Sequence, residues 1–288
     1  MVRGSSMKPG DPFLKWAGGK RKVVPHLRAH LPARFGCYHE PFVGGGALFF
    51  QLAALLKPPF TGVVLGDGNE RLVRCYRAVR DNVEQVIRIL ELYTVSHCEE
   101  FFYALRAMDI DGAGDHEVAA WLIYLNRTAF NGLYRVNSRG GFNVPFGKYV
   151  NPTICNADHL RACAALLQGV QIEHEGFEAV LGRAQPGDLV YFDPPYVPLS
   201  KTASFTGYTR GGFGPAQQEQ LRDVALELAG RGVCVLLSNH DTPEVRELYP
   251  AKQFQLRVVP VARAINSKGT KRGKVDELVI VARGAPRS

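Results

Sequence analysis

The sequence predicts an α/β fold, and three observations support this class. The short apolar run Leu189–Phe192 has the composition of a buried strand, and the prolines of Asp193-Pro194-Pro195-Tyr196 then prevent both its extension and an immediate helix. A second strand, near residues 38–43, enters a turn of three glycines that a helix follows. Strands and helices then alternate along most of the remaining chain, as in α/β proteins.

The composition indicates a folded protein without a membrane span. The chain has 288 residues, 46% of them hydrophobic, which is enough for one large core or a core with a smaller satellite domain. No apolar run reaches the roughly 20 residues that cross a bilayer, and the N-terminus lacks a signal-peptide core, so we expect a cytoplasmic protein. The six cysteines form no Cys-x-x-Cys pair, which predicts buried thiols. The net charge of +8 fits a polyanionic partner or a solubility role equally well.

Two glycines and a lysine open the folded part of the chain. Gly18, Gly19 and Lys20 precede a basic, amphipathic segment that extends to about Leu31. A glycine turn before a helix presents free N–H groups, and the lysine adds a cation, which suits a carboxylate or phosphate. A simple turn with solvated lysines fits the same residues. The spacing excludes a nucleoside-triphosphate loop.

Two strand ends together predict a nucleoside pocket. The first strand enters the Gly44-Gly45-Gly46 turn, and about 20 residues later an apolar run ends at Asp67. Bare backbone allows a ligand to approach closely, and an acid at the next strand end can accept hydrogen bonds from ribose hydroxyls. Phe49 replaces the third small residue of a dinucleotide fingerprint, which argues against NAD. Tight packing alone is the alternative explanation for the glycines.

A helical region is followed by an irregular basic segment. Apolar residues recur with helical spacing from about residue 69 to residue 125, which predicts packed core helices. Residues 130–149 then combine glycines, asparagines, aromatic rings and cations, with no acid. Cations and amides can read base edges, and rings can fill a vacated place in a base stack, so this composition suits DNA. A solvated basic hairpin is the alternative.

The second half of the chain supplies more strands and two polar loops. Strands are predicted at 170–173, 233–239, 254–261 and 277–281, and helices at 157–167 and 217–228. Phe177 follows one strand, where its ring could lie against an adenine face. Residues 198–214 predict a mobile loop over the pocket. Residues 263–274 hold five cations and no acid, which suits phosphate contacts or, alternatively, an exposed turn.

The Asp193-Pro194-Pro195-Tyr196 turn predicts a site for a flat ring that carries an amino group. Proline has no N–H, so carbonyls here stay outside local backbone pairing and remain available beside the Asp193 carboxylate. An exocyclic amine can donate to these acceptors while its ring lies against Tyr196. The alternative is a strand-ending turn with a packed tyrosine.

Several strings of this sequence, taken in the order in which they occur, resemble the Dam family of DNA adenine-N6 methyltransferases, which use S-adenosylmethionine. The likeness extends from Phe13 to about Ile280 and rests on seven strings. They are Leu14-Lys15-Trp16-Ala17-Gly18-Gly19-Lys20, Glu40-Pro41-Phe42-Val43-Gly44, Asn131-Gly132-Leu133 with Arg135, Phe142-Asn143-Val144-Pro145-Phe146-Gly147, Asp193-Pro194-Pro195-Tyr196, Ser238-Asn239-His240-Asp241 and Lys274-Val275-Asp276-Glu277-Leu278.

The resemblance implies a Rossmann-like methyltransferase fold. Its seven-stranded, mostly parallel sheet has helices on both faces and one antiparallel strand near the end, with an inserted, mainly helical target-recognition domain that carries a basic hairpin loop. Residues 71–155 would form that domain, residues 7–70 and 156–288 the catalytic domain, and residues 1–6 look like a vector-derived scar. The implied cofactor-binding residues are Trp16, Ala17, Gly18, Lys20, Glu40, Phe42, Gly44, Gly46, Asp67, Phe177 and Asp193.

The resemblance also implies a bacterial or phage enzyme that acts on double-stranded DNA at GATC, and we expect a monomer because no obligate protein partner is evident. Phe130 stands where some relatives have Tyr, and Lys148 stands where close relatives have Arg, whose planar fork a flexible ammonium cannot reproduce. Residues implied to face the bases are Lys15, Leu133, Arg135 and Pro145, with Asn131 near the orphan partner of the flipped adenine. Further DNA contacts are expected from Phe130, Asn143, Lys148, Tyr149, Lys268, Lys271 and Arg272.

The expected reaction is a direct transfer of the sulfonium methyl group to adenine N6, which leaves S-adenosylhomocysteine. Asp193 and Pro194 would accept hydrogen bonds from the amino group, Pro195 would stiffen the turn, and Tyr196 would hold the extruded base. No metal is expected. The absence of a Pro-Cys dipeptide argues against cytosine-C5 methylation. Cytosine-N4 transfer, RNA methylation and a non-catalytic DNA-binding protein remain as alternatives.

Overall fold

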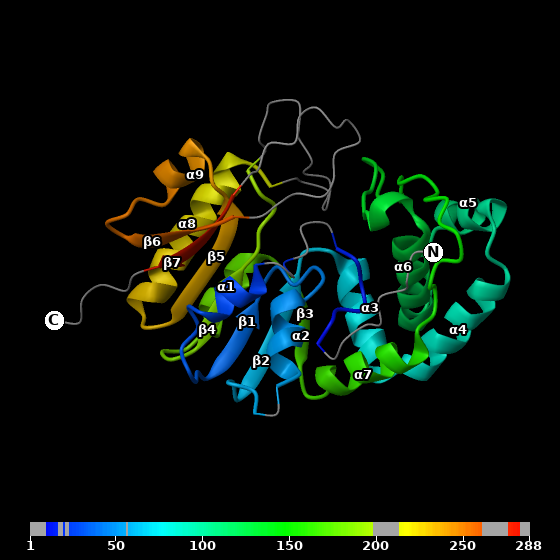
Figure 1. Cartoon of the computed structure of the whole chain (residues 1–288), viewed down its shortest axis with the longest axis horizontal. Coiled ribbons are helices and arrows are strands. Elements are labelled where there is room, and N and C mark those ends of the chain that lie inside the picture. Colours follow the sequence, from blue (N-terminus) through cyan, green and yellow to red (C-terminus); the bar gives the residue numbers. More distant parts are fainter. Residues whose placement is uncertain are drawn as a thin grey trace.

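A seven-stranded sheet forms the centre of the computed structural model, which describes residues 10–16, 20, 23–55, 57–197, 213–260 and 276–282 (Figure 1). The strands are β1 Cys37–Glu40, β2 Gly62–Asp67, β3 Gln171–His174, β4 Leu189–Phe192, β5 Cys234–His240, β6 Phe254–Val259 and β7 Glu277–Ala282. The helices are α1 Val24–Arg28, α2 Ala47–Ala53, α3 Glu70–Asp81, α4 Val83–Val95, α5 Glu99–Ala107, α6 Asp115–Thr128, α7 Ala157–Leu167, α8 Pro215–Gly230 and α9 Pro243–Leu248, with 3-10 turns η1 Phe130–Gly132 and η2 Phe177–Gly182.

The strand order places a switch point in the middle of the sheet. The order is β3-β2-β1-β4-β5-β7-β6, so the chain moves outward from β1 to β3 and then returns to the other side of β1 with β4. The strands from β3 to β5 are parallel, whereas β7 runs antiparallel between β5 and β6. All seven predicted strands are confirmed, as is the antiparallel strand near the end. Sheets of this kind bind ligands at the carboxyl edge of such a switch point.

Helices cover both faces of the sheet, as predicted. In β4, Leu189 and Tyr191 point into one core cluster, whereas Val190 and Phe192 point into the other. The first cluster includes apolar residues of α1, α2 and α3, and the second those of α8 and α9. A strand that is buried on both faces has no polar alternation, which is why this segment is a continuous apolar run in the sequence.

The helices α3 to α6 group at the β3 side of the sheet, while α8 and α9 lie beside β5 to β7 at the other end (Figure 1). Helix α6 is buried continuously from Val118 to Thr128 and packs against α3 and α4. Its core cluster is continuous with that of the first sheet face. In the part of the chain described, no helix is long and apolar enough to cross a membrane.

The irregular segment after α6 is confirmed. Two isolated bridges join Ala129 with Phe146 and Val136 with Phe142, and the rest of its backbone is the 3-10 turn η1, a short turn and stretches without regular structure. Buried rings of Phe142 and Tyr134 anchor its underside to the helical core. The segment is therefore anchored on the side that faces the helical core, and its polar and cationic side chains stay accessible to solvent.

Candidate active site

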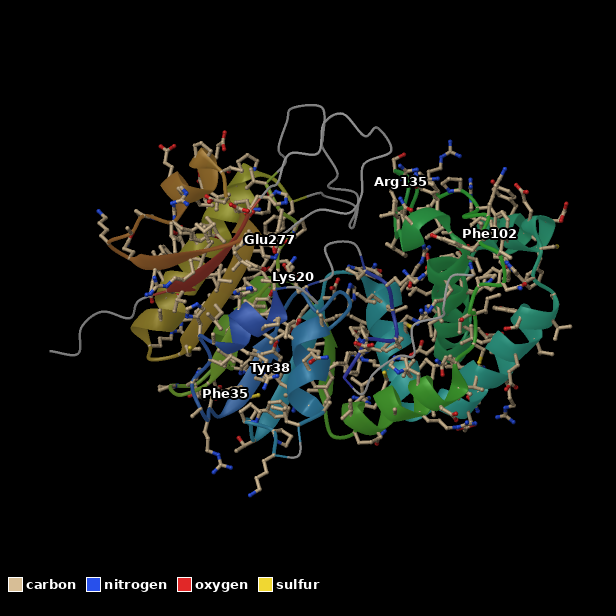
Figure 2. The ribbon with its side chains drawn as sticks, viewed as in Figure 1. Lys20, Phe35, Tyr38, Phe102, Arg135 and Glu277 are labelled. Atoms are coloured by element: carbon tan, nitrogen blue, oxygen red, sulfur yellow. The ribbon has the colours of Figure 1, made fainter. Side chains whose placement is uncertain are left out.

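Three functional segments meet at the switch point because their strands are neighbours. The glycine turn follows β1, Asp67 ends β2, and the Asp193–Tyr196 turn follows β4, so all three lie at the carboxyl edge of the parallel strands. Figure 2 shows Lys20 and Glu277 close together in the middle of the molecule, with Arg135 on the side of the helical region. The sequence prediction that these segments form one site is consistent with this placement.

The glycine turn and Asp67 are bonded to each other. Gly44 and Gly46 have φ values of 47° and 66°, a region that favours glycine, and a Cβ on Gly46 would lie 2.8 Å from the Tyr76 hydroxyl. The Asp67 carboxylate accepts the backbone N–H of Gly44 at 3.1 Å and that of Asn69 at 2.9 Å. Burial raises the pKa of Asp67 to about 6, although these two N–H groups stabilise its charged form. Each oxygen keeps a lone pair for another donor.

Glu40 and the aromatic residues flank this turn. The Tyr38 hydroxyl donates to Glu40 Oε2 at 2.9 Å, and burial raises the pKa of Glu40 to about 8. Its carboxyl group lies beneath the turn, where only 2% of the residue is exposed. The Phe177 ring stacks on Phe42 at 5.4 Å, and Phe213 meets both rings edge to face. Phe177, which was predicted to lie against an adenine, thus packs within a cluster of three rings.

The Asp193 carboxylate is fixed through one of its oxygens. Oδ1 accepts the Ser238 hydroxyl at 2.7 Å and pairs with Lys20 Nζ at 3.0 Å. Ser238 itself is fully buried and bonds the Tyr191 hydroxyl at 3.0 Å. Among the described residues none donates to Asp193 Oδ2 or to the Pro194 carbonyl. Within the described part of the chain, these two acceptors remain open to another donor.

The rest of the turn is held by residues from three elements. The Pro195 carbonyl accepts Gln218 Nε2 of α8 at 2.8 Å. The Tyr196 hydroxyl donates to Glu277 Oε2 at 3.0 Å, and Lys20 Nζ lies 4.3 Å from the centre of its ring. The His240 ring stands perpendicular to the Tyr196 ring at 4.6 Å. Because Lys20 covers one ring face, a base would have to stack on the other.

Sequence reasoning assigned no role to three of these supporting residues. Ser238 and Glu277 belong to strings that resemble the family, but only the folded sheet shows that both reach the turn after β4. Gln218 lies on a helix whose polar residues are mostly exposed. The available signal was the polar end of β5, since polar groups at the end of a buried strand need partners.

The residues predicted to face the bases lie together on the helical side. Buried Asn126 accepts the Lys15 backbone N–H at 2.8 Å and donates to the Gly132 carbonyl at 3.0 Å, so it joins two segments that are far apart in sequence. Arg135 Nε donates to Asn143 Oδ1 at 2.6 Å and Nη2 to the Asn143 carbonyl at 3.2 Å. In this structure Asn143 therefore positions Arg135.

Several of the predicted DNA contacts are exposed beside these residues. Phe130 is 48% exposed and Tyr149 38% exposed, and Lys15 Nζ lies 5.4 Å from the Tyr149 ring centre. Asn131 has a φ of 57° and Lys148 a φ of 50°. Leu133 and Pro145 belong to the same segment, with Pro145 exposed and Leu133 half-buried. Predictions outside the described residues concern Ala17, Gly18, Lys268, Lys271, Arg272 and most of the loops 198–214 and 263–274.

The family model and the relatives found by sequence agree on one family. The model for the D12 class of N6 adenine-specific DNA methyltransferases matches residues 16–265. The Type II methyltransferase M1.LlaDCHI of Lactococcus lactis subsp. cremoris is 41% identical over 279 residues, which cover 95% of each chain. The DNA adenine methylase of Escherichia coli strain K12 is 39% identical, again over 95% of each chain. An rRNA methylase from Streptococcus thermophilus aligns structurally over 93% of this chain and 97% of its own, with 10% identity and a TM-score of 0.37.

Proposed function

The chain belongs to the D12 class of N6 adenine-specific DNA methyltransferases, and on that premise we propose that it transfers the methyl group of S-adenosylmethionine to adenine in GATC sites. The observation that carries the proposal is the Asp193 turn, whose two remaining acceptors match the two hydrogens of an adenine amino group. Adenine specificity of the family also argues against the cytosine-N4 and RNA alternatives.

The cofactor pocket is proposed at the glycine turn. S-adenosylmethionine supplies an electrophilic methyl group on a positively charged sulfur. Asp67 has lone pairs left for ribose hydroxyls, and the positive φ values of Gly44 and Gly46 leave bare backbone beside it. The rings of Phe42 and Phe177 offer an apolar contact for the cofactor's adenine. The site therefore fits the chemistry of a nucleoside with a charged sulfur.

The target amine would be oriented by Asp193 and Pro194. Adenine N6 is a weak nucleophile because its lone pair is delocalised into the ring. Hydrogen bonds from both N6 hydrogens to Asp193 Oδ2 and the Pro194 carbonyl favour a pyramidal nitrogen and direct its lone pair out of the ring plane. Lys20 and Ser238 hold the carboxylate in place for this task. Asp193 Oδ2 is also the basic atom available for the proton that N6 gives up.

Base recognition is proposed for the region that includes residues 71–155. Arg135 uses its Nε and one Nη2 hydrogen on Asn143, and among the described residues none accepts from Nη1. The Nη1 and Nη2 ends are thus left as a fork, the shape that binds guanine O6 and N7. Asn126 holds the backbone of Lys15 beside the turn that contains Asn131, so Lys15 adds a second cation to the proposed DNA-binding surface. GATC begins with guanine, which is consistent with this fork.

The proposal can be tested with plasmid from cells that express the protein and lack other GATC methylation. Digestion with nucleases of opposite sensitivity to GATC methylation should show protection, and mass analysis of the nucleosides should identify N6-methyladenine. The Asp193→Ala variant should lose transfer while it still binds the duplex. Retained transfer by this variant, or methylcytosine in the digest, would refute the assignment.

A further inference from the structure

Tyr134 lies between two residues that the proposed function assigns to base recognition, Leu133 and Arg135. Unlike these half-buried neighbours, Tyr134 is only 5% exposed and points into the protein. Its ring stacks on Trp16 with the centroids 5.4 Å apart and the planes at 21°. Phe142 contacts the ring edge to face at 5.8 Å. The segment that carries Leu133 and Arg135 therefore contacts Trp16 through this buried ring, next to the hydrogen bonds by which Asn126 joins Lys15 and Gly132.

Trp16 in turn lies on the glycine turn of the cofactor pocket. A Cβ on Gly44 would come within 2.7 Å of Trp16 Cδ1, so the indole lies directly against this glycine. The backbone N–H of Gly44 is bonded to Asp67, the proposed ribose acceptor. A continuous set of contacts thus leads from Asp67 through Gly44, Trp16 and Tyr134 to the residues that face the bases.

A second set of contacts joins the same two places through Arg71. The Asp67 carboxylate binds the N–H of Asn69, which caps helix α3, and Arg71 lies in the first turn of that helix. Arg71 contacts Tyr134, forms a two-point ion pair with Asp111 at 2.6 and 2.9 Å, and donates to a carbonyl in the turn at residues 137–141 at 2.8 Å. Tyr134 is the side chain at which both sets of contacts meet.

We propose that Tyr134 is a positioning residue that couples the cofactor pocket to base recognition. A cofactor that orders the glycine turn holds Trp16 in place, and the stacked Tyr134 then holds Leu133 and Arg135 in their base-reading positions. This inference rests on the proposed function, because it requires that the chain binds both ligands. By linkage, each ligand must raise the affinity of the other by the same factor.

The coupling factor is measured by titration of a GATC duplex with and without S-adenosylhomocysteine, and of S-adenosylhomocysteine with and without the duplex. For the unmodified protein we expect a factor of about 5 or more, equal in both directions. Tyr134→Leu should lower this factor toward 1, because the stacked contact between Trp16 and the residues that face the bases is lost. Tyr134→Phe keeps the stacked ring and should keep most of the coupling. Tyr103→Leu, which removes a 40% exposed ring of α5, is the matched control and should change nothing.

The possible outcomes separate this inference from the proposed function. If the unmodified protein binds neither S-adenosylhomocysteine nor GATC duplex, the proposed function itself is wrong. If it binds both with a factor of 1, or if folded Tyr134→Leu keeps the full factor, only the coupling role is overturned. Should Tyr134→Leu not fold, Trp16→Leu removes the other ring of the same stack. A direct loss of cofactor affinity in that variant does not affect the coupling factor, because this factor is the ratio of the affinities with and without the duplex.

Discussion

The Ser238→Ala substitution tests whether the orientation of Asp193 limits methyl transfer. Ser238 donates a 2.7 Å hydrogen bond to Asp193 Oδ1, and Lys20 would be the only other described group left on that oxygen. A hydrogen bond to a charged group contributes about 1.5 to 3 kcal/mol. If that energy is lost only in the transition state, the single-turnover rate falls by about 10- to 150-fold, because 1.36 kcal/mol corresponds to a factor of ten.

The same substitution also affects folding, and a second variant separates the two effects. The Tyr191 hydroxyl, in a residue only 1% exposed, loses its 3.0 Å partner in Ser238→Ala, which costs about 1 to 3 kcal/mol of stability. Tyr191→Phe leaves the bond between Ser238 and Asp193 intact, so it should transfer methyl at close to the normal rate. Rates come from single-turnover transfer with both substrates saturating, and stabilities from urea unfolding. The reasoning fails if Ser238→Ala is fully active or if Tyr191→Phe loses as much activity.

Three further predictions concern recognition, pH and the glycine turn. Arg135→Ala should reduce, by about 1 to 3 kcal/mol, the difference in binding free energy between a GATC duplex and a duplex with the guanine replaced. Asn143→Ala should have a smaller effect in the same direction. Equal losses of affinity for the matched and the mismatched duplex would contradict this prediction. Because the pKa of Asp67 is raised to about 6, its carboxyl group gains a proton as the pH falls through that value and then has one acceptor fewer. The affinity for S-adenosylhomocysteine, measured by calorimetry, should therefore decrease below about pH 6. In Asp67→Asn the affinity should not change over this pH range. Gly46→Ala should destabilise the fold by about 1 to 3 kcal/mol in urea unfolding, because φ is 66° at this position and the new Cβ would lie 2.8 Å from the buried Tyr76 hydroxyl. The control is Gly182→Ala, since no atom lies within 4 Å of a Cβ at that position. Equal effects of the two substitutions would refute the argument.

The strands and the turns that follow them were predictable because their signals are local. A run such as Leu189–Phe192 is apolar throughout since both of its faces are buried, and the prolines after it end the strand wherever it lies in the sheet. The Gly44 turn was likewise visible as glycines after a strand. Helix α9 was missed because its six residues are too few to show a helical period, although Thr242 caps it.

The supporting contacts of the site were not predictable because they depend on distant pairings. The sequence predicted that Lys20 binds an anion or the cofactor. In the structure its ammonium group pairs with Asp193 and lies 3.9 Å from Glu277. Glu277 reaches this place only because β7 inserts antiparallel between β5 and β6. The Asn143 contact with Arg135 similarly depends on the isolated bridge within residues 130–149. Local patterns carry no information on such long-range registers.

The most direct test of the central claim is a crystal structure with S-adenosylhomocysteine and a GATC duplex. The account predicts an extruded adenine whose N6 lies within about 3.2 Å of both Asp193 Oδ2 and the Pro194 carbonyl oxygen, the range of a hydrogen bond. An adenine that remains in the duplex stack, or an amino group that faces away from these two oxygens, would contradict it.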